Sequence, residues 1–126
     1  MSLPIPDPVT QPFWDSLKAH AIQLQRCGSC QQFVFYPRAV CPTCLSDELV
    51  WTHVSGRGVI HAFTIPYRHA PEPYVIVLVE LEEGPRMLSN LVGVEPRPEM
   101  VKIGSPVEVV YEDVNETITL PKFKPA

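Results

Sequence analysis

Two Cys-x-x-Cys pairs constrain this chain more than any other feature of its sequence. The pairs are Cys27/Cys30 and Cys41/Cys44, with ten residues between them, and they contain all four cysteines of the chain. A Cys-x-x-Cys in a tight turn directs both sulfurs at one point, and two such turns make a tetrahedral S4 site that suits zinc. Four thiolates leave no open coordination position, so we expect one structural zinc per chain, bound by all four cysteines.

Two other uses of the cysteines are a pair of disulfides and a thioredoxin-like redox pair. The first residues, MSLPIPDPVTQPFW, have neither a basic segment nor a continuous apolar segment, so we expect no signal peptide and a cytoplasmic location. A reducing cytoplasm disfavours disulfides, and no βαβ pattern surrounds either motif. The segment between the pairs has few core side chains. A zinc ion contributes on the order of 10 kcal/mol to the folding of such a segment, which also favours the metal site.

The length and composition indicate one domain, or one domain with a small appendage. Of the 126 residues, 45% are hydrophobic, enough for a core, and 19% are charged, too few for a solvated disordered chain. The most apolar run, YVIVLVEL, is too short to cross a bilayer as a helix, so we expect no membrane insertion. The formal charge of −4 disfavours polyanionic partners.

Residues 1–26 are expected to form an extended, proline-rich arm and then a helix. In TQPFWDSLKAHAIQLQRC, Thr10 suits an N-cap, Pro12 is tolerated in the first turn, and the helix is expected to end near Arg26. Its apolar stripe is a candidate partner interface, made of Phe13, Trp14, Leu17, Ala21 and Leu24. The same stripe would pack equally well on the chain's own ribbon or barrel.

Residues 27–46 are expected to form the zinc ribbon, and residues 47–126 a β-barrel with a C-terminal tail. ELVWTHVSGRGVIHAFTIPY alternates like a long first strand bent at Gly56 and Gly58. A loop, RHAPEP, leads to YVIVLVELEEG, a strand expected to be buried on both faces. PRMLSNLVGV, PVEVVYEDV and ETITLPKF predict three more strands, with a helical turn in EPRPEMVKIGS. A mainly β fold with five strands in this order is typical of an OB-type Greek-key barrel.

Four segments, in this order, carry a family resemblance: PFWDSLKAHAIQLQRCGSC, YPRAVCPTC, WTHVSGRGVIHAFT and LPKFKP. Together they resemble the zinc-ribbon OB-fold proteins known as domain of unknown function 35. The resemblance implies an N-terminal helical region, a rubredoxin-like zinc ribbon and an OB barrel. It also implies an acyl-CoA-binding accessory role beside thiolase-like condensing or aldolase enzymes, or hydratases, of acyl-CoA metabolism (lipid, sterol or polyketide). Gln31 stands where many members have glycine, which alters the turn slightly and leaves the four ligands intact.

Catalysis by this chain alone is not expected. The candidate groups are His20, His53, His61 and His69, and none stands in a recognisable acid, base and nucleophile pattern. The cysteines are committed to zinc, and HExxH, P-loop and GxGxxG motifs are absent from the sequence.

An acyl-CoA site would need basic groups for the CoA phosphates and an apolar slot for the pantetheine arm. Most basic side chains are expected to be solvated, and most aromatic ones to be core. The candidates for the CoA-binding site are Arg38, Trp51, Arg57, Phe63, Arg68, Lys122, Phe123 and Lys124.

The alternative function is that of a single-stranded nucleic-acid-binding module, because zinc ribbons and OB barrels both bind nucleic acids. The 14 acidic residues outnumber the 10 basic ones, and no basic cluster is present, so we expect no nucleic-acid partner. The sequence leaves homodimer formation open.

Overall fold

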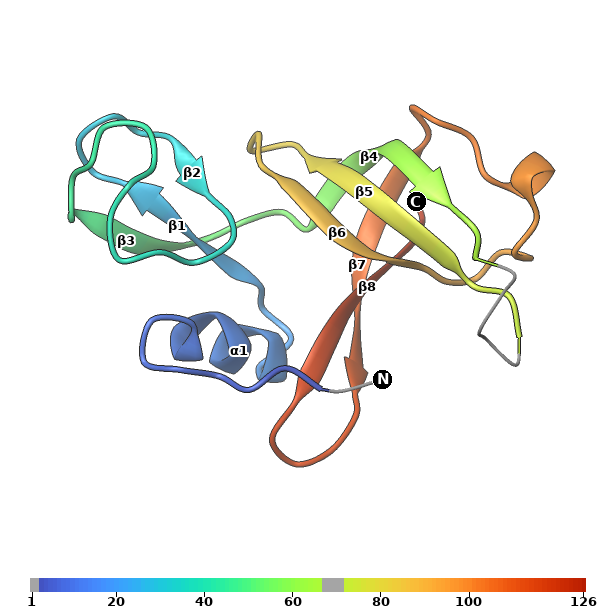
Figure 1. Cartoon of the computed structure of the whole chain (residues 1–126), viewed down its shortest axis with the longest axis horizontal. Helices are drawn as coiled ribbons and strands as arrows, with labels where there is room; N and C mark the ends of the chain where they lie inside the picture. The colour runs from blue at the N-terminus through green and yellow to red at the C-terminus, as the bar shows by residue number, and fades with distance from the viewer. Residues whose placement is uncertain (1–2, 67–71) are drawn as a thin grey trace. The chain divides into compact units, whose positions relative to one another are not determined.

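The computed structural model describes residues 3–66 and 72–126, which form two compact units. One unit contains the chain up to Ser55, Glu83–Pro85 and Tyr111–Leu120, and the other contains the rest. The helix and the first three strands (Figure 1) are α1 (Gln11–Lys18), β1 (Gln23–Cys27), β2 (Phe33–Val34) and β3 (Leu49–His53). The later elements are β4 (Arg57–Thr64), β5 (Val75–Leu81), β6 (Arg86–Leu91), the 3₁₀ turn η1 (Pro98–Met100), β7 (Pro106–Asp113) and β8 (Thr119–Pro125).

The helix is shorter than predicted, because the chain turns sharply after Lys18. His20 has a positive φ of 56°. Its N–H donates to the Leu17 carbonyl (2.9 Å), and the N–H of Ala21 donates to the Ser16 carbonyl (3.0 Å). These two bonds form a Schellman motif, which ends a helix at a left-handed residue. The prediction that the helix continues to Arg26 was therefore wrong.

The N-terminus of the helix is also held differently from the prediction. Thr10 occupies the N-cap position, but its hydroxyl makes no capping bond. The Asp7 carboxylate instead accepts the N–H groups of Val9 and Thr10, both at 2.9 Å. An aspartate turn thus joins the arm to α1.

The end of the predicted helix forms β1, the central strand of a small antiparallel sheet with the order β2-β1-β3. Leu24 pairs with Thr52 and Cys27 with Leu49. The spacing of Ile22, Leu24 and Arg26 fits both a helix and a strand, and β3 supplies the pairing partner that decides between them.

The long bent strand predicted across residues 48–67 is two strands in two sheets. β3 pairs with β1, whereas β4 pairs with β5 and β7. Gly56, with a φ of 74°, lies between them, and the Ser55 N–H donates to the Glu83 carboxylate (2.8 Å). The barrel therefore begins at Arg57, and β3 belongs to the unit that contains the cysteines.

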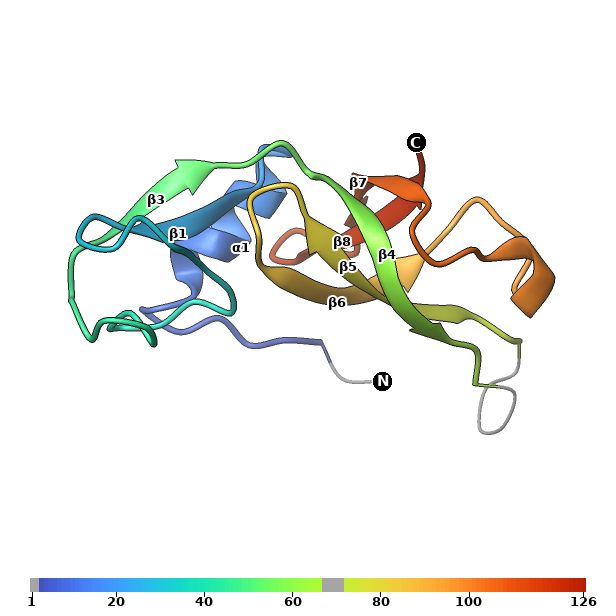
Figure 2. The same ribbon diagram turned by 90° about the horizontal axis from the view of Figure 1, so that it is seen from above.

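The predicted five-stranded barrel is confirmed, with the closed order β4-β5-β6-β8-β7. Figure 2 shows β4, β5 and β6 curving into it. A register shift between Ile60 and Ala62 bends β4, and β6 pairs in parallel with β8 at Leu91 and Phe123. In β5 only alternate residues are buried, so the prediction of burial on both faces was wrong.

No helix in the described part of the chain is both long and apolar enough to span a membrane.

Candidate metal centre and ligand sites

The two Cys-x-x-Cys segments fold into the same turn. The Gln31 N–H donates to the Cys27 carbonyl at 2.9 Å, and the Leu45 N–H donates to the Cys41 carbonyl at the same distance. The residue after the second cysteine has a positive φ in both turns, 67° at Gln31 and 63° at Leu45. Each turn therefore reverses the chain within a few residues and directs its two sulfurs to the same side.

The four sulfurs are spaced to hold one tetrahedral metal ion. All four lie within 4.8 Å of one another, with 3.5 Å between Cys27 and Cys44 and 3.7 Å between Cys30 and Cys41. In a regular tetrahedron, Zn–S bonds of about 2.3 Å place the sulfurs roughly 3.8 Å apart. The N–H groups of Cys30 and Thr43 lie 3.4 Å from the sulfurs of Cys27 and Cys41, where they stabilise thiolate charge. The residues present therefore fit a structural zinc ion.

Backbone N–H donors, burial and the neighbouring sulfurs give the four thiols different pKa values. The N–H of Cys44 is the main cause that lowers the pKa of Cys41 to about 6, and the N–H of Cys30 lowers the pKa of Cys27. The Ser46 N–H also favours the Cys44 thiolate, but the Cys27 sulfur, burial and the other two sulfurs outweigh it and raise the pKa of Cys44 to about 12. A metal ion that takes four thiolates must displace the protons that remain, so its binding weakens in acid.

The candidate CoA-binding residues fall into both units. Arg38 and Trp51 belong to the first unit, and Arg68 lies outside the described residues, as does His69. The barrel unit contains Arg57, Phe63, Lys122, Phe123 and Lys124.

Of the barrel candidates, Phe123 is not available as the wall of a ligand slot. Its side chain is 0% exposed and belongs to the barrel core. Lys122 donates to the Asn90 side-chain oxygen (2.8 Å), and the Lys124 ammonium lies 3.4 Å from the Glu108 carboxylate. Arg57 is exposed at the start of β4, and Phe63 is half-buried on the same strand.

The candidate interface stripe lies mostly inside the first unit. All of its residues are buried except Ala21, which is half-buried; the others are Phe13, Trp14, Leu17 and Leu24. The Phe13 ring packs edge-on against Phe35 and Tyr36, with centroids 5.6 and 6.0 Å apart. The helix thus packs on the chain's own ribbon, as the alternative interpretation held, and these side chains are not exposed to a partner.

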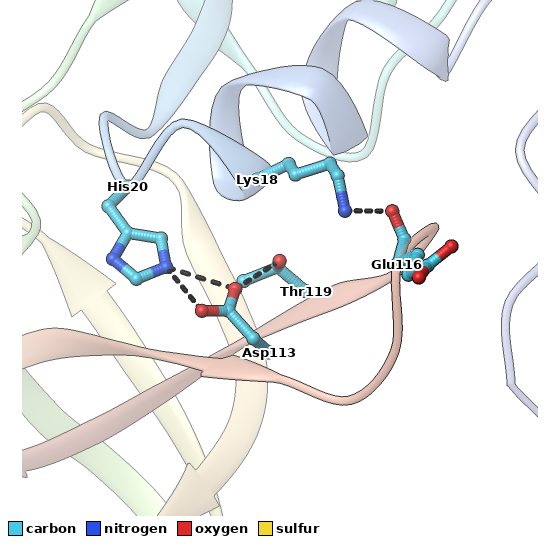
Figure 3. Close-up of polar contacts among 5 residues, drawn as sticks. All are labelled: Lys18, His20, Asp113, Glu116 and Thr119. Carbon is cyan, nitrogen blue, oxygen red and sulfur yellow. Dashed lines mark hydrogen bonds and ion pairs between the residues drawn. The ribbon is translucent and has the colours of Figure 1, made fainter.

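A polar cluster that the sequence did not predict joins the end of α1 to the tip of the β7–β8 hairpin (Figure 3). The His20 Nε2 lies 3.0 Å from both carboxylate oxygens of Asp113, and the Thr119 hydroxyl donates to one of them at 2.6 Å. The Lys18 ammonium donates to the Glu116 carbonyl. The Thr119 hydroxyl first, and then His20, lower the pKa of Asp113.

Tyr111, on β7, makes two further contacts with residues that follow α1. Its ring stacks on the His20 ring with centroids 4.8 Å apart, and its hydroxyl accepts the Ile22 N–H at 3.0 Å. His20 and Asp113 are 93 positions apart, so no local pattern in the sequence identifies the pair.

These features define a class of protein, a zinc ribbon joined to an OB barrel, and comparisons with known proteins agree. Consecutive parts of the chain match two family models, the rubredoxin-like zinc ribbon domain of ChsH2 over residues 14–50 and the C-terminal OB-fold domain of ChsH2 over residues 51–112. A DUF35 domain-containing scaffold protein of Methanothermobacter thermautotrophicus is 35% identical over 97 residues, which cover 72% of this chain and 71% of the relative. The chain belongs to the DUF35 family.

Other relatives carry enzyme names. A chain of the solved Ltp2-ChsH2(DUF35) aldolase is 30% identical, with a TM-score of 0.84 and 98% of each chain covered. The probable enoyl-CoA hydratase alpha subunit of Thermomonospora curvata is 34% identical over 120 residues. The 3-oxo-4,17-pregnadiene-20-carboxyl-CoA hydratase alpha subunit of Mycobacterium tuberculosis is 40% identical over 112 residues. The present chain spans only 37% and 33% of the lengths of these two hydratase subunits.

Proposed function

We propose that this chain is a non-catalytic accessory subunit that binds an acyl-CoA enzyme, a thiolase-like aldolase or a hydratase, and contributes to binding the acyl-CoA. The observation that carries the proposal is the likeness to the chain of the Ltp2-ChsH2(DUF35) aldolase, which covers 98% of both chains at 30% identity. The hydratase names of the two longer relatives indicate the same substrate class.

The histidine contacts support an accessory role. A nucleophilic hydroxyl is activated when the imidazole itself accepts its proton. Here the Thr119 hydroxyl donates to Asp113 and not to His20, so the order of the three groups is wrong for that chemistry. The Nε2 of His53 is paired with the Gln23 side chain at 3.1 Å. The gain to the partner would come from positioning the substrate and excluding water.

For the acyl-CoA, we propose that the barrel supplies phosphate contacts from Arg57, Lys122 and Lys124 and an apolar contact from Phe63. Lys124 and Glu108 are both partly exposed, and exposed ion pairs of this kind are weak. A phosphate group would therefore displace Glu108 at little cost, whereas Lys122 must leave Asn90.

The pairing of basic side chains favours this proposal over a single-stranded nucleic-acid partner. The Arg97 guanidinium lies beside two carboxylates, those of Glu95 (2.6 Å) and Glu99 (3.7 Å). The Arg26 guanidinium lies over the Phe33 ring, 5.2 Å from its centroid. Binding to single strands depends on free basic groups that neutralise phosphates, together with exposed aromatic rings.

Co-expression tests the proposal. The chain is produced with an aldolase or hydratase subunit encoded beside it, and we expect one stable complex and acyl-CoA binding by calorimetry. The double variant Arg57→Ala/Phe63→Ala should weaken CoA binding and leave the complex intact, with the exposed Val59→Ala as the matched control on β4. If the proteins do not associate and no acyl-CoA binds, the proposal fails. Submicromolar binding to single-stranded DNA at moderate salt would establish the alternative.

A further inference from the structure

A pocket of about 600 Å³ opens on the first unit beside the second Cys-x-x-Cys turn. Its exposed apolar walls include Val9, Tyr36, Val40 and Leu45, and its two charged residues are Asp7 and Arg38. None of these residues is a metal ligand, and the buried stripe of α1 contributes none of them.

Leu45 combines two unfavourable features, a left-handed backbone and an exposed apolar side chain, whereas the neighbouring turn has only the first of them. Its φ of 63° is a left-handed conformation that favours glycine, and its side chain is 75% exposed. The equivalent residue of the first turn, Gln31, is polar and donates to the Gly28 carbonyl at 2.9 Å. The turn itself requires the left-handed backbone, but it does not require a large exposed apolar side chain, so leucine at this position is a candidate contact for a partner.

The walls of the pocket are preorganised. The Tyr36 ring packs edge-on against Phe13 and Phe35, with centroids 6.0 and 5.4 Å apart. Gln25, only 5% exposed, holds the backbone of Arg38 from both sides, since its amide donates to the Arg38 carbonyl and accepts the Arg38 N–H, each at 2.8 Å. A rigid, concave surface with an aromatic wall loses little conformational entropy when it binds.

The pocket has one acidic side chain, Asp7, and one basic side chain, Arg38. An oxygen of the Asp7 carboxylate already accepts the N–H groups of Val9 and Thr10. In the part of the chain that the structure describes, the Arg38 guanidinium has no hydrogen bond or ion pair. An apolar pocket with one unpaired guanidinium complements an apolar group next to a carboxylate.

We propose that this pocket is where the partner enzyme docks, by inserting an apolar side chain flanked by an aspartate or glutamate that pairs with Arg38. The inference rests on the proposed function and names the surface that performs it. A second copy of this chain would bring its own Asp7 and Arg38 to the contact, so the test below also measures whether the chain alone forms a dimer.

The test compares two turns of the same geometry in the complex with the co-expressed aldolase or hydratase subunit. Leu45→Gly should raise the thermal stability of the chain, because it relieves the left-handed strain, yet weaken the complex by about tenfold or more. Gln31→Gly, the matched control, should raise the stability and leave the affinity unchanged. Arg38→Glu should weaken the complex without a loss of stability, and exchange of the facing partner carboxylate for lysine should restore it.

Each other outcome overturns the inference. If the complex forms and Leu45→Gly and Arg38→Glu bind the partner like the wild type, the pocket is not the docking surface, and the proposed function stands. If no complex forms, the proposed function fails first. If the chain alone is a dimer that Leu45→Gly dissociates, the occupant is a second copy. If both variants abolish acyl-CoA binding by the chain alone, the pocket is a ligand site.

Discussion

At the residue scale, the left-handed residue after each cysteine pair sets the shape of the metal centre. The sequence predicted that glutamine in place of glycine at position 31 leaves the ligands intact, and the sulfur distances agree with this. A side chain in the left-handed region costs roughly 1–2 kcal/mol, and this cost remains in the folded protein at Gln31 and Leu45.

Gln31→Gly should therefore raise the free energy of unfolding by about 0.5 kcal/mol. This is the left-handed cost less the greater backbone entropy of glycine and the exposed side-chain bond to the Gly28 carbonyl. Gln32→Gly is the control, because Gln32 lies next in the chain and lacks a positive φ. It should lower the stability, since glycine gains nothing there. Urea unfolding of the zinc-loaded protein measures both, and equal effects of the two variants would contradict the explanation.

At the scale of elements, one close contact sets how near two barrel strands can approach, and a second contact fixes the position of the helix. In the barrel, Gly58 lies against β5 so closely that a Cβ atom would stand 2.3 Å from the Glu80 carbonyl oxygen and 2.8 Å from a Val79 methyl group. In the first unit, the contact of His20 with Asp113 holds the end of α1 against the β7–β8 hairpin.

Gly58→Ala should destabilise the barrel by about 3 kcal/mol, because the backbone of β5 must move to admit the methyl group. Gly104→Ala is the control. A Cβ atom at Gly104 meets nothing within 4 Å, so only its φ of 87° opposes the change, and we expect a cost of about 1 kcal/mol. Chemical denaturation monitored by far-UV circular dichroism compares them, and a Gly58→Ala barrel as stable as Gly104→Ala would refute the steric explanation.

The Asp113 contact predicts a pH dependence. The folded state lowers the pKa of Asp113, so its stabilisation is fully present above the ordinary aspartate pKa and is lost as the pH falls through the lower, folded value. Asp113→Asn should therefore be less stable than the wild type at neutral pH, and the difference should shrink below about pH 4. The exposed Asp47→Asn serves as control. Thermal unfolding from pH 3 to pH 7 measures the difference, and a constant difference would be the contrary result.

At the scale of the whole molecule, the two units depend on different stabilising forces. The ribbon's small core includes two of the metal ligands, Cys27 and Cys41, packed with Val34. The barrel has a larger apolar core of its own, which includes Val75, Val77, Val79, Met87, Val107 and Phe123. The ribbon should therefore need its metal, whereas the barrel should not.

Removal of zinc with a strong chelator should unfold the ribbon and leave the barrel folded. Both tryptophans, Trp14 and Trp51, belong to the first unit, so their fluorescence reports that unit alone. Hydrogen exchange of β5 amides reports the barrel. We expect the fluorescence change without loss of β5 protection, the same result for Cys41→Ser, and recovery on zinc addition for the wild type only. Loss of both signals together would show one cooperative unit.

The sequence by itself determined the features that depend on short-range chemistry. The Cys-x-x-Cys spacing identified all four ligands, and short strand-like segments rich in apolar residues identified β5, β6, β7 and β8. The prediction from the sequence failed where the same residues fit two local patterns. Residues 22–26 fit a helix and a strand equally, and residues 48–67 were predicted as one strand because alternation does not show where a strand changes partners.

Only the tertiary structure decided which segments far apart in the sequence contact one another. Pairing with β3 made β1 a strand, and packing under Phe35 and Tyr36 turned the candidate interface residue Phe13 into core. The contact of His20 with Asp113 and the exposure of Leu45 beside Arg38 also appear only in the fold. Their common cause is that burial and pairing depend on which surfaces the complete chain brings together, and a local pattern records only that a side chain is apolar or charged.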